Sequence, residues 1–77
     1  MFNTLVVQSL HMHYLLQAKL LRVKLLLALK DYSAVISEAG YILKEDENNL
    51  EALLLRGRAY YYLADHDVAT KLVSQQF

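Results

Sequence analysis

Residues 53–63 read Leu53-Leu-Leu-Arg-Gly-Arg-Ala-Tyr-Tyr-Tyr-Leu63, and this stretch decides the fold. Its apolar residues recur as they do in a helix, yet Gly57 lies in the middle. A glycine inside a helix costs about 1 kcal/mol relative to alanine. A small residue repays that cost where two helix backbones approach closely. Gly57 is therefore a flexible joint, part of a basic binding loop, or a contact point between helices. The 34-residue repeat of this chain favours the contact point, where a leucine would push the helices apart.

The composition predicts one small helical domain. The chain has 77 residues, 56% of them hydrophobic, with two glycines and no proline or cysteine. Without cysteine, a disulfide framework and a thiolate zinc site are both excluded. Eight basic and eight acidic residues balance, which argues against nucleic acid as a partner. The apolar run from Leu5 to Leu29 is interrupted by three cations, so no membrane span and no clear signal peptide are predicted.

The charges are divided unevenly along the chain. Residues 1–30 contain Lys19, Arg22, Lys24 and Lys30 and no acid, whereas residues 31–77 contain all eight acids and four bases. The two parts therefore carry net charges of +4 and −4 (4 − 0 and 4 − 8). We interpret the basic part as a helix with a basic polar face.

Apolar periodicity predicts helices over residues 17–29, 33–44 and 50–63, with a fourth starting near Asp67. Asp31 or Ser33 is the expected N-cap of the second of these helices. Turns are expected at residues 30–32, 44–49 and 64–66. Residues 1–16 form an atypical segment that is also expected to be helical.

Sliding the chain by 34 positions aligns helix with helix and turn with turn. Leu20-Leu-Arg22 meets Leu54-Leu-Arg56, and Asp31 meets Asp65. A helix–turn–helix unit of this period is typical of the tetratricopeptide repeat (TPR). The expected fold class is all-α, with antiparallel helix pairs of an incomplete TPR solenoid. Residues 17–49 would form a first repeat and residues 50–77 a second, incomplete one. The structural positions of the second repeat are Gly57, Tyr60, Leu63 and Ala69, with Tyr60 facing the core.

Residues 18–69, and "GYILKEDENNLEALLLRGRAYYYLADHD" above all, resemble the TPR region of a family of J-domain co-chaperones. The family is DnaJ subfamily C, member three, of the p58 kinase-inhibitor type, in a plant-like form. The resemblance implies binding of unfolded or misfolded polypeptide, delivery to an Hsp70-type chaperone, and location in the endoplasmic reticulum lumen. It also implies a link to the unfolded protein response. No enzymatic activity and no cofactor are implied.

The chain departs from that family in two respects. The His-Pro-Asp motif of a J domain is absent, so stimulation of an Hsp70 ATPase is not carried over. After Ala69 the repeat pattern is lost, because Val73 and Gln76 occupy an aromatic and a small position. A truncated product is therefore expected, marginally stable alone and prone to self-association through uncovered repeat faces. Two alternatives stay open, namely a generic cytosolic TPR scaffold with one specific partner and a non-functional product.

Ligands of TPR arrays lie on the concave face formed by the first helix of each repeat, so the repeat register predicts a peptide-binding surface. Its candidates are Leu20, Lys24, Leu27, Leu54, Arg58, Tyr61 and Tyr62, with Gln17 and Glu51 beside them. Alternatively, these residues pack against neighbouring repeats. The Lys/Asn clamp for acidic chaperone tails is missing, because Leu20, Lys24 and Leu55 occupy its positions. His11 and His13 point to different faces of a helix and make no metal site, and no catalytic constellation is recognised.

Overall fold

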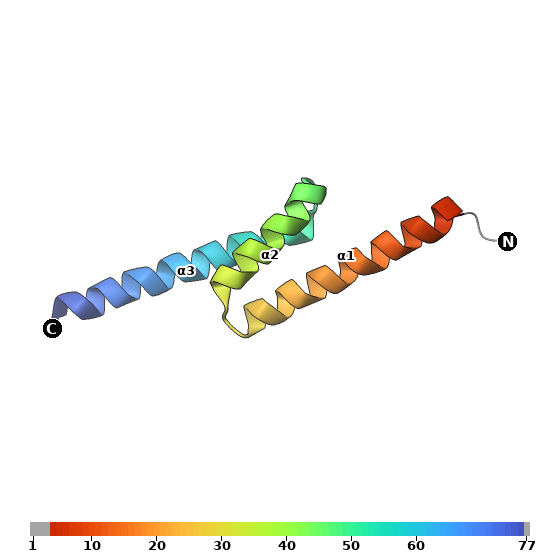
Figure 1. The fold of residues 1–77 in the computed structure, drawn as a ribbon. Helices are drawn as coiled ribbons and strands as arrows, with labels where there is room; N and C mark the ends of the chain where they lie inside the picture. The colour runs from red at the N-terminus through yellow and green to blue at the C-terminus, as the bar shows by residue number, and fades with distance from the viewer. Residues whose placement is uncertain (1–3, 77) are drawn as a thin grey trace.

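The computed structural model describes the backbone of residues 4–76 and the side chains of residues 4–67. Three helices make up this part of the chain: α1 (Thr4–Ala28), α2 (Tyr32–Glu45) and α3 (Leu50–Gln76). In Figure 1, α2 folds back from α1 and α3 packs beside α2. The N-terminal end of α1 and the C-terminal end of α3 extend beyond this contact in opposite directions. No strand occurs among residues 4–76, and the predicted all-α class is confirmed.

The turn between α1 and α2 is fixed by backbone and side-chain hydrogen bonds. Asp31 N donates to Leu26 O at 3.0 Å and Lys30 N to Leu27 O at 3.0 Å, which closes the end of α1. Lys30 has a left-handed φ of 63° at this point. Asp31 then caps α2, because its Oδ1 accepts from Ala34 N at 3.3 Å. Asp31 rather than Ser33 is therefore the cap.

The loop between α2 and α3 is equally local in origin. Asn49 Oδ1 accepts from Ala52 N at 2.9 Å and so caps the start of α3. Asn48 N donates to Asp46 Oδ1 at 3.3 Å inside the loop. The polar cluster at residues 44–49 thus ends one helix and starts the next, as its composition indicated.

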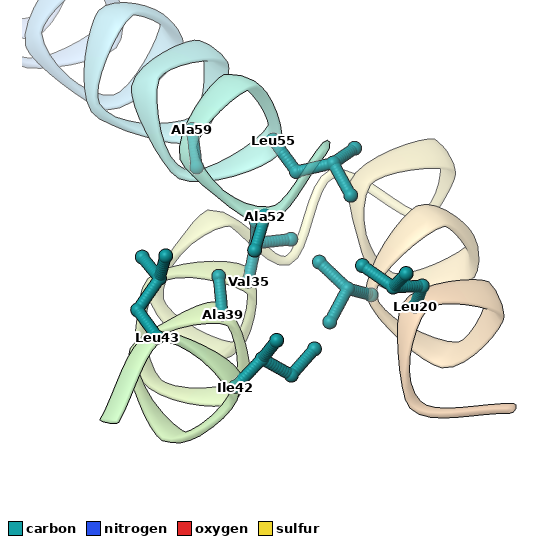
Figure 2. Close-up of a cluster of buried hydrophobic side chains, with 9 residues drawn as sticks. Leu20, Val35, Ala39, Ile42, Leu43, Ala52, Leu55 and Ala59 are labelled. Carbon is teal, nitrogen blue, oxygen red and sulfur yellow. The ribbon is translucent and has the colours of Figure 1, made fainter. Parts of the chain in front are cut away.

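A single apolar cluster joins the three helices, and its side chains converge from all of them in Figure 2. Small residues bring the helices close: Ala39 of α2 and Ala52 and Ala59 of α3 have no exposed surface. Larger side chains fill the space around these alanines. The remaining members of the cluster are Leu20, Val23, Val35, Ile42, Leu43 and Leu55.

Ion pairs explain the uneven distribution of charge along the sequence. Lys19 Nζ lies 3.6 Å from Glu45 Oε2, and an Arg22 amino nitrogen lies 3.4 Å from Glu38 Oε1. A third pair joins Lys24 Nζ to Glu51 Oε1. The basic face of α1 is thus opposite acids of α2 and α3. Each ion pair is partly exposed and contributes at most about 1 kcal/mol to the free energy of unfolding. The three ion pairs therefore matter more for which helices lie side by side than for the stability of the fold.

The structure contradicts the predicted turn at residues 64–66, because α3 continues through it to Gln76. No glycine or proline occurs between residues 58 and 76 to end the helix. Breaking the helix there would remove backbone hydrogen bonds unless new packing compensated for them.

The position of Tyr60 also differs from the prediction. Tyr60 was predicted to face the core, yet 53% of it is exposed. The side chain of Ala69 lies outside the described residues.

The predicted close contact at Gly57 is wrong for the same reason. A Cβ built at Gly57 would meet no atom within 4 Å, as is also the case at Gly40 in α2. With no second helix folding back across α3, Gly57 is an ordinary residue on its surface. The close approach between helices occurs instead at the buried alanines.

Gly57→Ala is therefore expected to raise the free energy of unfolding by about 0.5–1 kcal/mol, because it removes backbone freedom from the unfolded chain. Urea titration followed by circular dichroism would measure the change. Gly40→Ala is the matched control, since its surroundings are equally open. If Gly57→Ala lost stability while Gly40→Ala gained it, the result would indicate that another helix contacts Gly57 after all.

Candidate peptide-binding groove

An open groove runs between the C-terminal half of α1 and the N-terminal half of α3, next to the α1–α2 turn. Its volume is about 890 Å³. The structure brings together most of the predicted site residues in it: Lys24, Leu27, Leu54, Arg58 and Tyr62. The rest of the lining is formed by Ala28, Lys30, Tyr32, Glu51 and Leu55. We call these ten residues the α1–α3 groove.

Helical spacing accounts for the two walls. On α1, Lys24, Leu27 and Ala28 are three and four residues apart, so they share one face. On α3, Glu51, Leu54, Leu55, Arg58 and Tyr62 follow the same spacing over three turns. Each helix therefore presents one continuous stripe to the groove, in which apolar or aromatic residues alternate with charged ones.

An aromatic pair lies at the end of the groove nearest the α1–α2 turn. The rings of Tyr32 and Tyr62 stack, with centroids 5.5 Å apart and planes 24° from parallel. Tyr32 is the first residue of α2 and was not among the predicted site residues. Its sequence position in a turn gave no periodic signal, and the contact with Tyr62 arises only because α3 packs beside α2. Lys30 was missed for the same reason, whereas Ala28 lies one helical turn from Lys24 on α1 and could have been predicted from that spacing.

The charged residues of the groove differ in whether they have an ion-pair partner. Lys24 is paired with Glu51, and Glu51 is the acid of the lining. Lys30 and Arg58 take part in no ion pair within the described part of the chain. The groove thus combines leucine and tyrosine walls with an uncompensated positive charge. Such a surface has the chemistry to bind and orient a ligand, since apolar walls supply contact area and charged groups supply register.

Two predicted residues do not line the groove. Leu20 is only 2% exposed and belongs to the core cluster, so its assignment to a binding surface is wrong. Tyr61 is exposed but lies beside the groove, with its ring packed edge-on against Tyr62 at 5.5 Å and 75°. Of the two flanking residues, Glu51 lines the groove, whereas Gln17 is exposed away from it.

The described residues contain no group of three His, Cys, Asp or Glu side chains placed to hold a metal ion. Among the same residues, no helix has the length and apolar character needed to cross a membrane. The fold and the groove together define an all-α protein of packed helices with an open groove on one side.

Sequence comparison identifies the relatives of this chain. It is 80% identical, over 56 residues or 73% of its length, to the DnaJ protein P58IPK homolog A of Oryza sativa subsp. japonica. It is equally identical, over 55 residues, to the DnaJ protein P58IPK homolog of Arabidopsis thaliana. The match confirms the resemblance, because about three quarters of the chain is similar to a short segment of plant P58IPK-type DnaJ proteins. The chain spans only 12% and 11% of the length of these relatives. No family model and no solved structure matches it.

Proposed function

We propose that this chain is a polypeptide-binding module of the co-chaperone type, and that the α1–α3 groove holds an extended apolar segment of an unfolded protein. The observation that carries this proposal is the convergence of Lys24, Leu27, Leu54, Arg58 and Tyr62 in one groove. These residues are separated by up to 38 positions in the sequence (62 − 24). The names of the relatives, which are DnaJ proteins, support the same reading.

The chemistry of the walls favours extended apolar segments. Leu54 is 55% exposed and Tyr62 is exposed beside it, although both are large and apolar or aromatic. Covering such side chains releases water and contributes about 25 cal/mol per Å² of apolar surface. The groove is open along its length, so a chain in extended conformation fits it better than a compact ligand does.

The wider role is proposed for the protein in which this segment occurs. There the groove would hold unfolded or misfolded polypeptide, which an Hsp70-type chaperone then receives in the endoplasmic reticulum lumen. The chain itself would contribute binding and no enzymatic step. Neighbouring repeats would extend the groove and cover exposed residues such as Tyr60 and Tyr61.

Leu54→Ser is expected to weaken the binding of an apolar peptide about three- to tenfold, because it removes apolar surface from the groove wall. Leu25→Ser is the matched control: Leu25 is 57% exposed, yet it lies on α1 outside the groove lining. Fluorescence anisotropy with a panel of labelled apolar peptides would measure both variants. Equal weakening in the two variants, or binding by neither them nor the wild type, would contradict the proposal.

The same panel separates this function from that of a specific scaffold. An unfolded-chain binder should bind many apolar peptides weakly, because its contacts are to side-chain surface rather than to a defined sequence. A scaffold for one partner should bind a single member tightly and ignore the rest.

A further inference from the structure

The charge of the α1–α3 groove indicates a more specific ligand than an apolar segment. Its lining holds Lys24, Lys30 and Arg58 against the single acid Glu51. Because Glu51 is paired with Lys24, this acid is not available to the other two cations. The groove therefore has two cations without an acidic partner beside its leucine and tyrosine walls.

Arg58 is held by its helix in a position to act on a bound chain. It follows Leu54 by one helical turn and precedes Tyr62 by one turn, so Arg58 lies on the groove stripe of α3 between an aliphatic and an aromatic residue. Lys30 projects from the α1–α2 turn, which closes the same end of the groove. Both cations are exposed, so their attraction for an anion is modest and weakens as the salt concentration rises.

The acids nearest to these cations do not neutralise them. Asp31 and Asp65 line an adjoining hollow that shares Lys30, Tyr32 and Tyr62 with the groove. Asp31 Oδ1 accepts a hydrogen bond from Ala34 N as the cap of α2. Neither acid forms an ion pair with Lys30 or Arg58 in the described residues, although Lys30 borders both hollows.

We propose that the α1–α3 groove selects polypeptide segments in which apolar side chains are accompanied by a carboxylate, and that Arg58 and Lys30 bind this carboxylate. This inference rests on the proposed function and names its preferred ligand class. Arg58 presents a planar fork of donors that matches a carboxylate, whereas Lys30 adds a point charge. The apolar side chains of the segment lie against Leu27 and Leu54, and its acid lies toward the α1–α2 turn.

The experiment compares two labelled peptides that share an extended leucine- and phenylalanine-containing sequence and differ only in a central glutamate or glutamine. Binding to the full 77-residue chain is measured by fluorescence anisotropy at low and high salt. The glutamate peptide is expected to bind about three- to tenfold tighter at low salt and to lose most of that preference at high salt. Circular dichroism of each protein verifies its helix content.

Two variants test whether Arg58 causes the preference for the glutamate peptide. Arg58→Gln is expected to reduce the preference for the glutamate peptide to less than about twofold. Arg56→Gln is the matched control, because Arg56 lines a different hollow with Gly40 and Tyr41 and should keep the full preference. Equal loss in both variants, or equal affinity of the two peptides for the wild type, would overturn the inference while leaving the proposed function in place. Failure of both peptides to bind the folded wild type would overturn both.

Discussion

Leu20→Ala is expected to lower the free energy of unfolding by about 2–5 kcal/mol. Leu20 is buried against α2 in the core cluster and is the part of that cluster that α1 contributes together with Val23. Shortening it removes apolar contacts and leaves a space that short helices fill only in part. A chain of this size has a net stability of only a few kcal/mol. The variant should therefore lose its cooperative transition in urea or thermal titrations followed by circular dichroism.

Leu21→Ala is the control for this prediction. Leu21 is adjacent in sequence but exposed, so the change should alter stability by no more than about 0.5 kcal/mol. A Leu20→Ala variant that unfolds like the wild type but binds peptide poorly would contradict the burial of Leu20. That result would indicate that Leu20 belongs to the binding surface, as the sequence predicted.

Ala39→Leu is expected to destabilise the fold by about 1–3 kcal/mol, because the added atoms have no space to enter. Ala39 lies on α2 with no exposed surface, in the cluster that also contains Ala52 and Ala59 of α3. Figure 2 shows these short side chains where α2 and α3 approach each other. The larger residue would force the two helices apart.

Ala64→Leu provides the comparison, since Ala64 is exposed on α3 and leucine has nearly the helix propensity of alanine. Chemical denaturation of both variants tests the prediction. If Ala39→Leu were as stable as Ala64→Leu, the contact between α2 and α3 would be looser than the structure has it.

The location of the small residues at the helix contact differs from the one that the sequence predicted. The repeat pattern requires a small residue where two helices cross. It assigned that contact to Gly57, whereas the contact lies at Ala39, Ala52 and Ala59. A repeat register indicates which residue would meet a following helix, but the following helix must fold back for the contact to exist. In this chain α3 continues straight past residue 66.

The sequence likewise predicted only some of the residues that line the groove. Helical spacing placed Lys24 and Leu27 on one face of α1 and Leu54, Arg58 and Tyr62 on one face of α3, and all of them line the groove. Spacing does not indicate how far the neighbouring helices extend over that face. Leu20 is one turn from Lys24, yet the packing of α2 and α3 covers Leu20 and leaves Lys24 at the margin.

The sequence by itself determined the local features of this protein. The helical character, the turn near residues 30–32 and the polar loop at residues 44–49 could be read from nearby residues, because they depend on hydrogen bonds and patterns within a few positions of the chain. The resemblance to P58IPK-type DnaJ proteins could be read from residues 18–69. The structure chose Asp31 over Ser33 as the cap of α2 and showed that α3 continues through residues 64–66. Tertiary packing placed Leu20 in the core and Lys30 and Tyr32 at the groove. Those outcomes depend on which helix covers which face, and that is determined by packing between residues far apart in the sequence.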